Sequence, residues 1–196
     1  MKPHNCAMFF PMLRPAWRRF FPPALFAACV ALLAACGPKS PEPTRVISAR
    51  QLLTAEDCAA YYNVPFTRSN ESFLGDNPPT VERDHVTMMD FDSGKGDTVH
   101  LSLDQSVSVE ESRKRVREEK AVWVKDGGVT DEPGFGEGGG YSLSGETLKL
   151  ARPPYRVSVQ ASGRGDAFDK EKRREAVRHF AKIVDERLKK LAEQKP

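Results

Sequence analysis

The chain has 196 residues, of which 39% are hydrophobic and 29% are charged. This composition suits an ordinary globular protein of one domain, and it excludes a protein with several membrane spans. The formal net charge of +3 is unevenly distributed: residues 1–35 hold four basic and no acidic residues, whereas residues 36–196 hold 26 basic and 27 acidic ones. The basic character of the chain would therefore be lost with its first 35 residues.

Residues 1–35 have the plan of a signal peptide. Arg18 and Arg19 precede an uninterrupted apolar run over 24–35, and its 12 residues match the ~7–15 of a signal-peptide core. A transmembrane helix needs about 20 apolar residues, which disfavours a permanent span. The stretch before the apolar run is unusually long, so three start residues stay open: Met1, Met8 and Met12.

The apolar run ends in Leu33-Ala34-Ala35-Cys36-Gly37, which resembles the lipobox of bacterial lipoproteins. The resemblance implies cleavage between Ala35 and Cys36, a thioether-linked diacylglycerol on Cys36, and usually a further acyl chain such as palmitate on the new amino terminus. Two or more acyl chains hold a protein stably on a membrane, whereas one binds reversibly. Membrane lipid is thus the first expected partner. The alternative is an ordinary secretory signal with a cysteine nearby by chance.

Gly37 and the residues after it indicate which membrane would hold the protein and how the domain would be connected to its anchor. In Gram-negative lipoproteins an aspartate after the lipidated cysteine resembles an inner-membrane retention signal, so Gly37 favours the periplasmic face of the outer membrane if the host is Gram-negative. Residues 36–48 are expected to be a flexible tether, because three prolines exclude a helix and favour an extended chain: Pro38, Pro41 and Pro43. One domain, 49–196, would follow.

The first half of this domain predicts a helix, a hairpin and a second helix. The first helix begins after Thr54 as N-cap and ends at Pro65, and its expected inward residues are Leu53, Ala60, Tyr61 and Val64. Strands 85–92 and 98–104 flank a turn at 93–96. The second strand alternates, with Val99, Leu101 and Leu103 on one face and Thr98, His100, Ser102 and Asp104 on the other. A capping box at Ser108–Glu111 opens the second helix, which ends at Gly127-Gly128. Its expected inward residues are Val109, Val116, Ala121 and Val124.

The second half predicts three strands and a last helix. A glycine-rich segment, 133–140, leads into strands near 141–143, 147–151 and 155–161, and Asp166 caps a helix with one apolar stripe. Hairpins dominate, so we predict an α+β fold with a mainly antiparallel sheet of four to five strands and three helices packed on it.

Two segments carry a second resemblance. Leu53-Thr54-Ala55-Glu56-Asp57-Cys58 and Pro133-Gly134-Phe135-Gly136 resemble small actinobacterial lipoproteins of unknown function. These are similar in fold to the photosystem accessory protein PsbP and the Ran-binding protein Mog1. This chain lacks the cysteine that would partner Cys58. The resemblance implies a fold and no activity.

Residues with reactive or ligating chemistry are few after Cys36. Cys58 is expected to be a small apolar residue on the inner face of a helix; the alternative is a lone thiol that pairs between chains or has a function of its own. The spacing of the three remaining histidines, His85, His100 and His179, fits no zinc site, and Asp90–Asp97 lacks the closing glutamate of a calcium loop. We therefore expect no metal or other cofactor.

Three further patterns favour ordinary structure over a site. The sequence Gly134-x-Gly136-x-x-Gly139 matches a dinucleotide fingerprint, but a strand follows it instead of a helix, so we predict a mobile surface loop that could mould around a partner. The Arg164-Gly165-Asp166 adhesion tripeptide is a chance match. Residues 169–196 hold ten basic and six acidic residues, which fits a solvated helix with internal ion pairs, or a face for anionic headgroups or glycan.

These observations predict a membrane-anchored envelope lipoprotein that is a non-catalytic binding or structural module. Its partner would be an envelope protein or polymer, and the compartment argues against nucleic acid. One alternative is an enzyme whose residues converge only in the fold, with a pocket that holds two carboxylates or a carboxylate with His85 or His100. Another is a small-ligand carrier, which predicts a closed apolar cavity.

Overall fold

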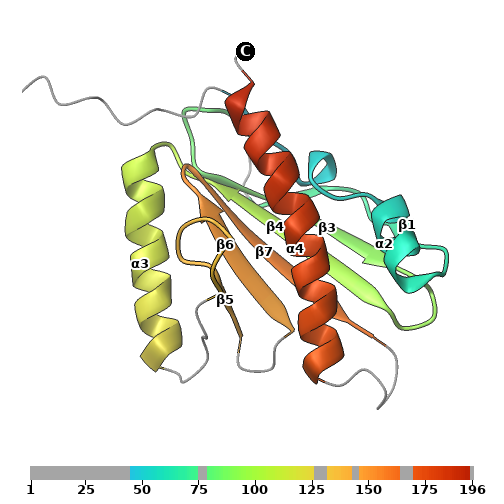
Figure 1. The fold of residues 1–196 in the computed structure, drawn as a ribbon. Helices are drawn as coiled ribbons and strands as arrows, with labels where there is room; N and C mark the ends of the chain where they lie inside the picture. Colours follow the sequence, from blue (N-terminus) through green and yellow to red (C-terminus); the bar gives the residue numbers. More distant parts are fainter. Residues whose placement is uncertain (1–44, 75–78, 126–131, 143–145, 164–169, 195–196) are drawn as a thin grey trace, which may run out of the picture. The chain divides into compact units, whose positions relative to one another are not determined.

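A computed structural model of the chain describes residues 45–74, 79–125, 132–142, 146–163 and 170–194 (Figure 1). The elements come in this order: η2 (Ala49–Gln51), α2 (Ala55–Tyr62), β1 (Thr67–Arg68), β2 (Ser72–Leu74), β3 (His85–Asp92), β4 (Thr98–Gln105), α3 (Val109–Lys125), β5 (Gly140–Tyr141), β6 (Thr147–Arg152), β7 (Tyr155–Ser162) and α4 (Lys170–Glu193). Several sequence predictions lie outside the described residues: the signal peptide, Ala35, Cys36, most of the tether, Gly127-Gly128 and Arg164–Asp166.

The strands form one antiparallel sheet in the order β1-β3-β4-β7-β6-β5, and β2 also pairs with β3. The predicted α+β class is confirmed, with three α-helices among the described residues. The sheet has seven strands instead of four or five, because β1 and β2 have only two or three residues and carry no alternating pattern. The predicted hairpin is confirmed: β3 pairs with β4 from His85 opposite Gln105 to Asp92 opposite Thr98.

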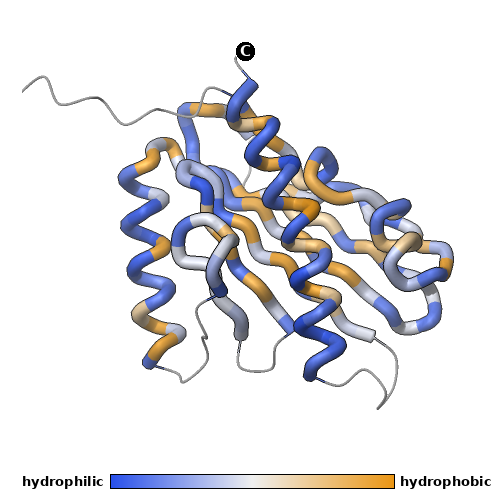
Figure 2. The backbone as a smooth tube through the Cα atoms, viewed as in Figure 1, coloured by the Kyte–Doolittle hydropathy of each residue, from blue (hydrophilic) through white to orange (hydrophobic). Residues whose placement is uncertain are grey.

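Alternation along the strands gives the sheet an apolar face and a polar face. On the apolar face, Leu101 of β4 lies opposite Val159 of β7, and Leu103 lies opposite Val157. The helix α4 packs there through a fully buried stripe that follows the predicted period: Val177, Phe180, Ala181, Val184 and Leu188. Figure 2 shows apolar and polar residues alternating along the strands that α4 crosses.

The folded body begins earlier than residue 49. The Tyr155 hydroxyl donates to the Arg45 carbonyl (3.0 Å), and the Ile47 amide donates to Gln105 Oε1 (3.3 Å). Ile47 is fully buried in the core, and the Ala49 amide donates to Thr87 Oγ1 (3.2 Å). Residues 45–48, which the sequence assigns to the end of the tether, are therefore part of the domain.

The helix α2 confirms its predicted start and corrects its inward face. The Asp57 amide donates to Thr54 Oγ1 (3.3 Å), and the Thr54 amide donates to Asp57 Oδ2 (2.9 Å), which completes a capping box. The helix ends at Tyr62, because Asn63 is left-handed. Ala60 is exposed, whereas Ala59 packs against the core, so the predicted inward role of Ala60 is wrong. Among the described residues, no helix has the length and apolar content to cross a bilayer.

Candidate functional site

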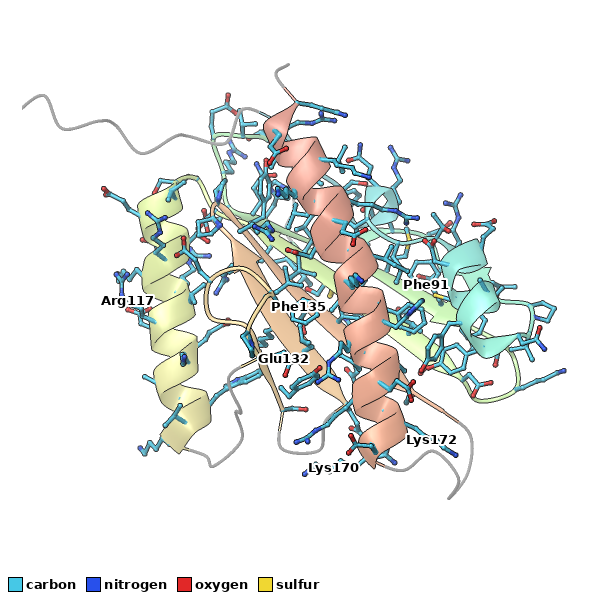
Figure 3. The ribbon with its side chains drawn as sticks, viewed as in Figure 1. Phe91, Arg117, Glu132, Phe135, Lys170 and Lys172 are labelled. Carbon is cyan, nitrogen blue, oxygen red and sulfur yellow. The ribbon has the colours of Figure 1, made fainter. Side chains whose placement is uncertain are left out.

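The helix α3 lies over the polar face of the sheet, opposite α4 (Figure 1). Its inward stripe alternates apolar and polar residues at helical spacing: Val109, Ser112, Val116, Glu119 and Trp123. Two predicted inward residues are wrong, because Ala121 is exposed and Val124 is 59% exposed. Figure 3 shows Arg117 pointing away from the sheet. The pattern of apolar residues predicts the inward face of α3 only in part, because polar side chains occupy some of the inward positions.

A network of ion pairs joins α3 to the sheet. Arg156 of β7 pairs with Asp104, its cross-strand neighbour on β4, and its Nη1 lies 3.0 Å from Glu119 Oε1. Lys149 Nζ of β6 lies 3.6 Å from Glu119 Oε2 and 4.1 Å from the centre of the Trp123 ring. Because the Arg156 side chain is only 12% exposed, its pairs are shielded from solvent more than typical surface pairs.

A second arginine ties the start of α3 to the same network. Arg115 pairs with Asp84 and, on its own helix, with Glu111 (3.2 Å). Its Nη1 lies 4.0 Å from Asp104 Oδ1, so Asp104 stands between Arg115 and Arg156. The sequence placed Asp104 correctly on the polar face of its strand. The sequence did not indicate that Asp104 pairs with Arg115 and Arg156.

A half-open cavity of about 180 Å³ lies between α3 and the polar face. Ser102 and Ser158 face each other across β4 and β7 on its sheet side, and Val116, Glu119 and Trp123 line it from α3. The lining also holds three acidic and three basic side chains: Asp104, Glu119, Glu137, Lys120, Lys149 and Arg156. It therefore differs from the closed apolar cavity expected of a small-ligand carrier.

The glycine-rich segment forms one rim of this cavity and is held in place. The Glu137 amide donates to the Ala151 carbonyl (2.7 Å), and Gly136 bridges to Ala151 of β6. A Cβ on Gly136 would overlap the Ala151 carbonyl oxygen, and φ is +64° there, so only glycine fits. These contacts fix the segment to β6, which corrects the prediction of a mobile loop. The strand β5 follows it, as predicted, whereas a dinucleotide-binding turn opens a helix.

Glu137 ties this rim to α3. Its carboxylate accepts three hydrogen bonds from the Arg113 guanidinium, at 2.8–3.1 Å. Hydrogen bonding from Arg113 holds the pKa of Glu137 below its usual value, although partial burial opposes this. The cavity is thus closed on this side by a charged pair.

Two buried polar atoms of the ion-pair network have no hydrogen-bond partner among the described residues. They are Arg156 Nε, a donor, and Asp104 Oδ1, an acceptor. Buried polar atoms of native proteins nearly always have a partner, from the protein, from water or from a ligand. Both atoms have less than 1 Å² of accessible surface, so they lie inside the packed network and not on the wall of the cavity, and Asp104 Oδ1 faces Arg115 Nη1 at 4.0 Å.

The three histidines lie apart. His100 Nδ1 lies 2.5 Å from Asp90 Oδ1, so His100 does meet a carboxylate, but this pair lies outside the cavity on the exposed part of the polar face. His85 is buried, and its Nδ1 lies 3.2 Å from the Arg83 carbonyl. His179 lies against the Tyr61 ring (4.7 Å between centres). No group of three or more metal-ligating residues forms within the described ranges.

Cys58 is fully buried in the core, as predicted. Burial raises the pKa of its thiol to about 12, and the neighbouring Asp57 and Glu56 act in the same direction. A thiol that stays protonated at neutral pH is a poor nucleophile and a poor metal ligand. Cys58 is therefore a core residue.

The basic excess of the last helix is largely used within the body. Arg173 pairs with Glu146 (2.7 Å), Arg178 with Glu132 (2.9 Å) and Arg187 with Asp57 (2.6 Å). Burial alone would raise the pKa of Asp57, but hydrogen bonds from Arg187 and Thr54 outweigh it and hold that pKa below its usual value. These three ion pairs link α4 to other elements of the body.

The chain matches no protein-family model, and no curated protein or solved structure matches it. The resemblance to PsbP-like and Mog1-like lipoproteins stays a prediction. The site was largely missed by sequence reasoning, because Arg156, Glu119, Lys149 and Trp123 come from three separate elements. A usable signal was the placement of charged residues at alternate strand positions.

Proposed function

We propose that this protein is a lipoprotein of the cell envelope, anchored to a membrane through Cys36, and that its folded body is a non-catalytic binding module. The observation that carries the proposal is the Leu33–Cys36 motif at the end of an apolar run of signal-peptide length. In a Gram-negative host, Gly37 after the cysteine favours the periplasmic face of the outer membrane.

The start of the folded body supports a short connection to the anchor. Eight residues, 37–44, lie between Cys36 and the described body, and the nine residue steps from Cys36 to Arg45 span at most about 28 Å at ~3.1 Å per residue. The Arg45 side chain donates to Gln194 Oε1 (3.2 Å), so the chain joins the body beside the last turn of α4. A body on such a tether would work close to the membrane surface.

The cavity beneath α3 supports a binding role for the body. Its lining joins the Ser102 and Ser158 hydroxyls and several charged side chains to an apolar wall, and its rim is a fixed backbone segment. Preformed pockets with a few convergent polar groups are the usual form of binding sites. An envelope polymer or protein that presents a small polar group would be the partner.

Metabolic labelling tests the anchor. The full chain is expressed in a bacterium with lipoprotein maturation and is fed an alkyne analogue of palmitate, beside Cys36→Ser and, as matched controls, Cys29→Ala and Cys58→Ala. We expect labelling of the parent and both controls, and neither labelling nor normal cleavage in Cys36→Ser. Unchanged labelling of Cys36→Ser would refute the proposal.

A further inference from the structure

One row of residues across the sheet marks the end of the body at which the chain from the anchor enters. His85 begins β3, Gln105 ends β4 and Tyr155 begins β7, and the strand register places them side by side. The Tyr155 hydroxyl donates to the Arg45 carbonyl at this end. The last turn of α4 and the first turn of α3 lie there too (Figure 1). We call this part of the body the entry end.

Three of the five large apolar side chains that are well exposed among the described residues lie at the entry end. Their exposed fractions are 45% for Phe73, 60% for Leu74 and 39% for Val107. Leu74 pairs with the second residue of β3, and Val107 follows the end of β4 by two residues. The other two, Val122 and Val124, lie about 20 Å further along α3. The exposed apolar surface is thus concentrated where the chain from the anchor joins the body.

The end of β2 is covered on neither of its faces. Successive residues of a strand point to opposite faces of the sheet, so the side chains of Phe73 and Leu74 point to opposite sides. Both are exposed, and β2 pairs with β3 and with no other described strand. Apolar side chains that the body leaves exposed as a group mark a surface for contact with a partner or a membrane.

The length of the tether selects the membrane as the partner of this surface. Cys36 lies at most about 28 Å from Arg45, so acyl chains on Cys36 hold the entry end close to the lipid headgroups. A short tether raises the effective concentration of the second contact, so even a weak contact is populated. Val122 and Val124, at the far end of α3, gain less from this proximity.

The charges at the entry end are mixed. Exposed Arg83, Lys189 and Lys190 suit the phosphates of anionic headgroups, but the exposed carboxylates of Glu82 and Glu193 lie at the same end. Their sum is close to neutral, so attraction between charges contributes little. The apolar side chains therefore provide the contact.

We infer that the entry end rests on the surface of the membrane that holds Cys36, with Phe73, Leu74 and Val107 between the headgroups and the acyl chains. The inference rests on the proposed anchoring and names the surface of the body that meets the bilayer. Apolar side chains of peripheral proteins are buried in this way at the boundary of headgroups and acyl chains. The strands then point away from the bilayer, and the end of α3 is held clear of it.

Quenching of tryptophan fluorescence by brominated phospholipids measures the contact, because bromine on an acyl chain quenches an indole only at short range. The full chain is expressed in a bacterium with lipoprotein maturation, with Trp17→Phe and Trp123→Phe to remove both tryptophans. One new tryptophan is placed at the entry end, by Phe73→Trp or Val107→Trp. The matched controls place it in an exposed valine position at the far end, by Val122→Trp or Val124→Trp.

Each protein is reconstituted into vesicles of brominated phosphatidylethanolamine and phosphatidylglycerol, and circular dichroism confirms its fold. We expect at least threefold more quenching at positions 73 and 107 than at positions 122 and 124. A second substitution locates the contact. Leu74→Asp places a charge in the interface and should reduce the quenching of the Val107→Trp protein at least twofold, whereas the matched Val122→Asp should leave it unchanged.

The mass of the amino-terminal peptide shows separately whether Cys36 carries acyl chains. If it does, equal quenching at both ends, or none at either, overturns the inference and leaves the anchoring intact. A second copy of the chain or a protein partner on the entry end would give that result. A chain without acyl chains on Cys36 refutes the anchoring, and the inference fails with it.

Discussion

The helices α4 and α3 lie on opposite faces of one sheet and are held there by different forces. α4 buries a continuous apolar stripe, with Phe180 and Leu188 fully inaccessible to solvent. α3 instead meets the sheet through ion pairs of Glu119 and Arg115, and it leaves a cavity beneath it. Apolar burial is non-directional and closes gaps, whereas ion pairs act at fixed geometry and can span a space. The face that contributes most of the apolar core and the face that holds the cavity are therefore distinct.

The largest loss of stability should come from a substitution on the α4 face. Phe180→Ala should lower the free energy of unfolding by about 3–5 kcal/mol, because it leaves a cavity in a closed core. The matched change on α3, Val116→Ala, should cost about 1 kcal/mol, since Val116 is only partly buried and already borders a cavity. Urea unfolding followed by circular dichroism measures both. Equal costs would remove the distinction between the two faces.

The packing of the cavity rim against β6 should require a glycine at position 136. Gly136 and Gly94 have nearly the same backbone φ, +64° and +66°, but a Cβ would overlap the Ala151 carbonyl only at Gly136. We expect Gly94→Ala to cost about 1 kcal/mol from backbone strain and Gly136→Ala about 3 kcal/mol. Thermal unfolding of both variants compares them. If Gly136→Ala is no worse than Gly94→Ala, the close approach to β6 is not required.

The ion pair on the α4 side predicts a dependence on pH. The pKa of Asp57 is lower in the folded state than in the unfolded state, so its stabilisation is present above about pH 4 and is lost as the pH falls through the folded pKa. Asp57→Asn should cost about 1–2 kcal/mol at pH 7 and close to nothing at pH 2. Urea unfolding at a series of pH values measures this, with the exposed Glu118→Gln as control. A constant difference across the series would contradict the assignment.

A high salt concentration should destabilise α3 more than α4. At 1 M ionic strength the screening length is about 3 Å, which weakens partly exposed ion pairs. We expect the amides of α3 to exchange hydrogen about threefold faster in 1 M than in 0.05 M NaCl, which corresponds to ~0.6 kcal/mol. The amides of α4 should change little. Equal changes in both helices would show that they are held by the same forces.

The sequence predicted the apolar face better than the polar face. The stripe of α4 and the alternation of Val99, Leu101 and Leu103 follow from period alone, and the structure has them as predicted. Strands β1 and β2, which the sequence did not predict, are too short to carry a pattern. Docking of residues 45–48 depends on acceptors such as Gln105 and Thr87, which lie far away in the chain.

The cavity could not be predicted from the sequence, for a related reason. Asp104 and Arg156 become neighbours only through the register of β4 with β7, and Glu119 joins them only because α3 crosses that face. The inward position of Glu119 contradicts the usual preference for apolar residues, so the pattern suggested Ala121 and Val124 instead. Ion pairs between distant elements leave no local signature in a single sequence.

The most direct test of the account is the mass of the amino-terminal peptide of the mature protein, purified from cells in detergent. We predict that this peptide begins at Cys36 and carries the added mass of a diacylglycerol, with or without a further acyl chain. A mature chain that begins at another residue, or that begins at Cys36 with a free thiol, would contradict it.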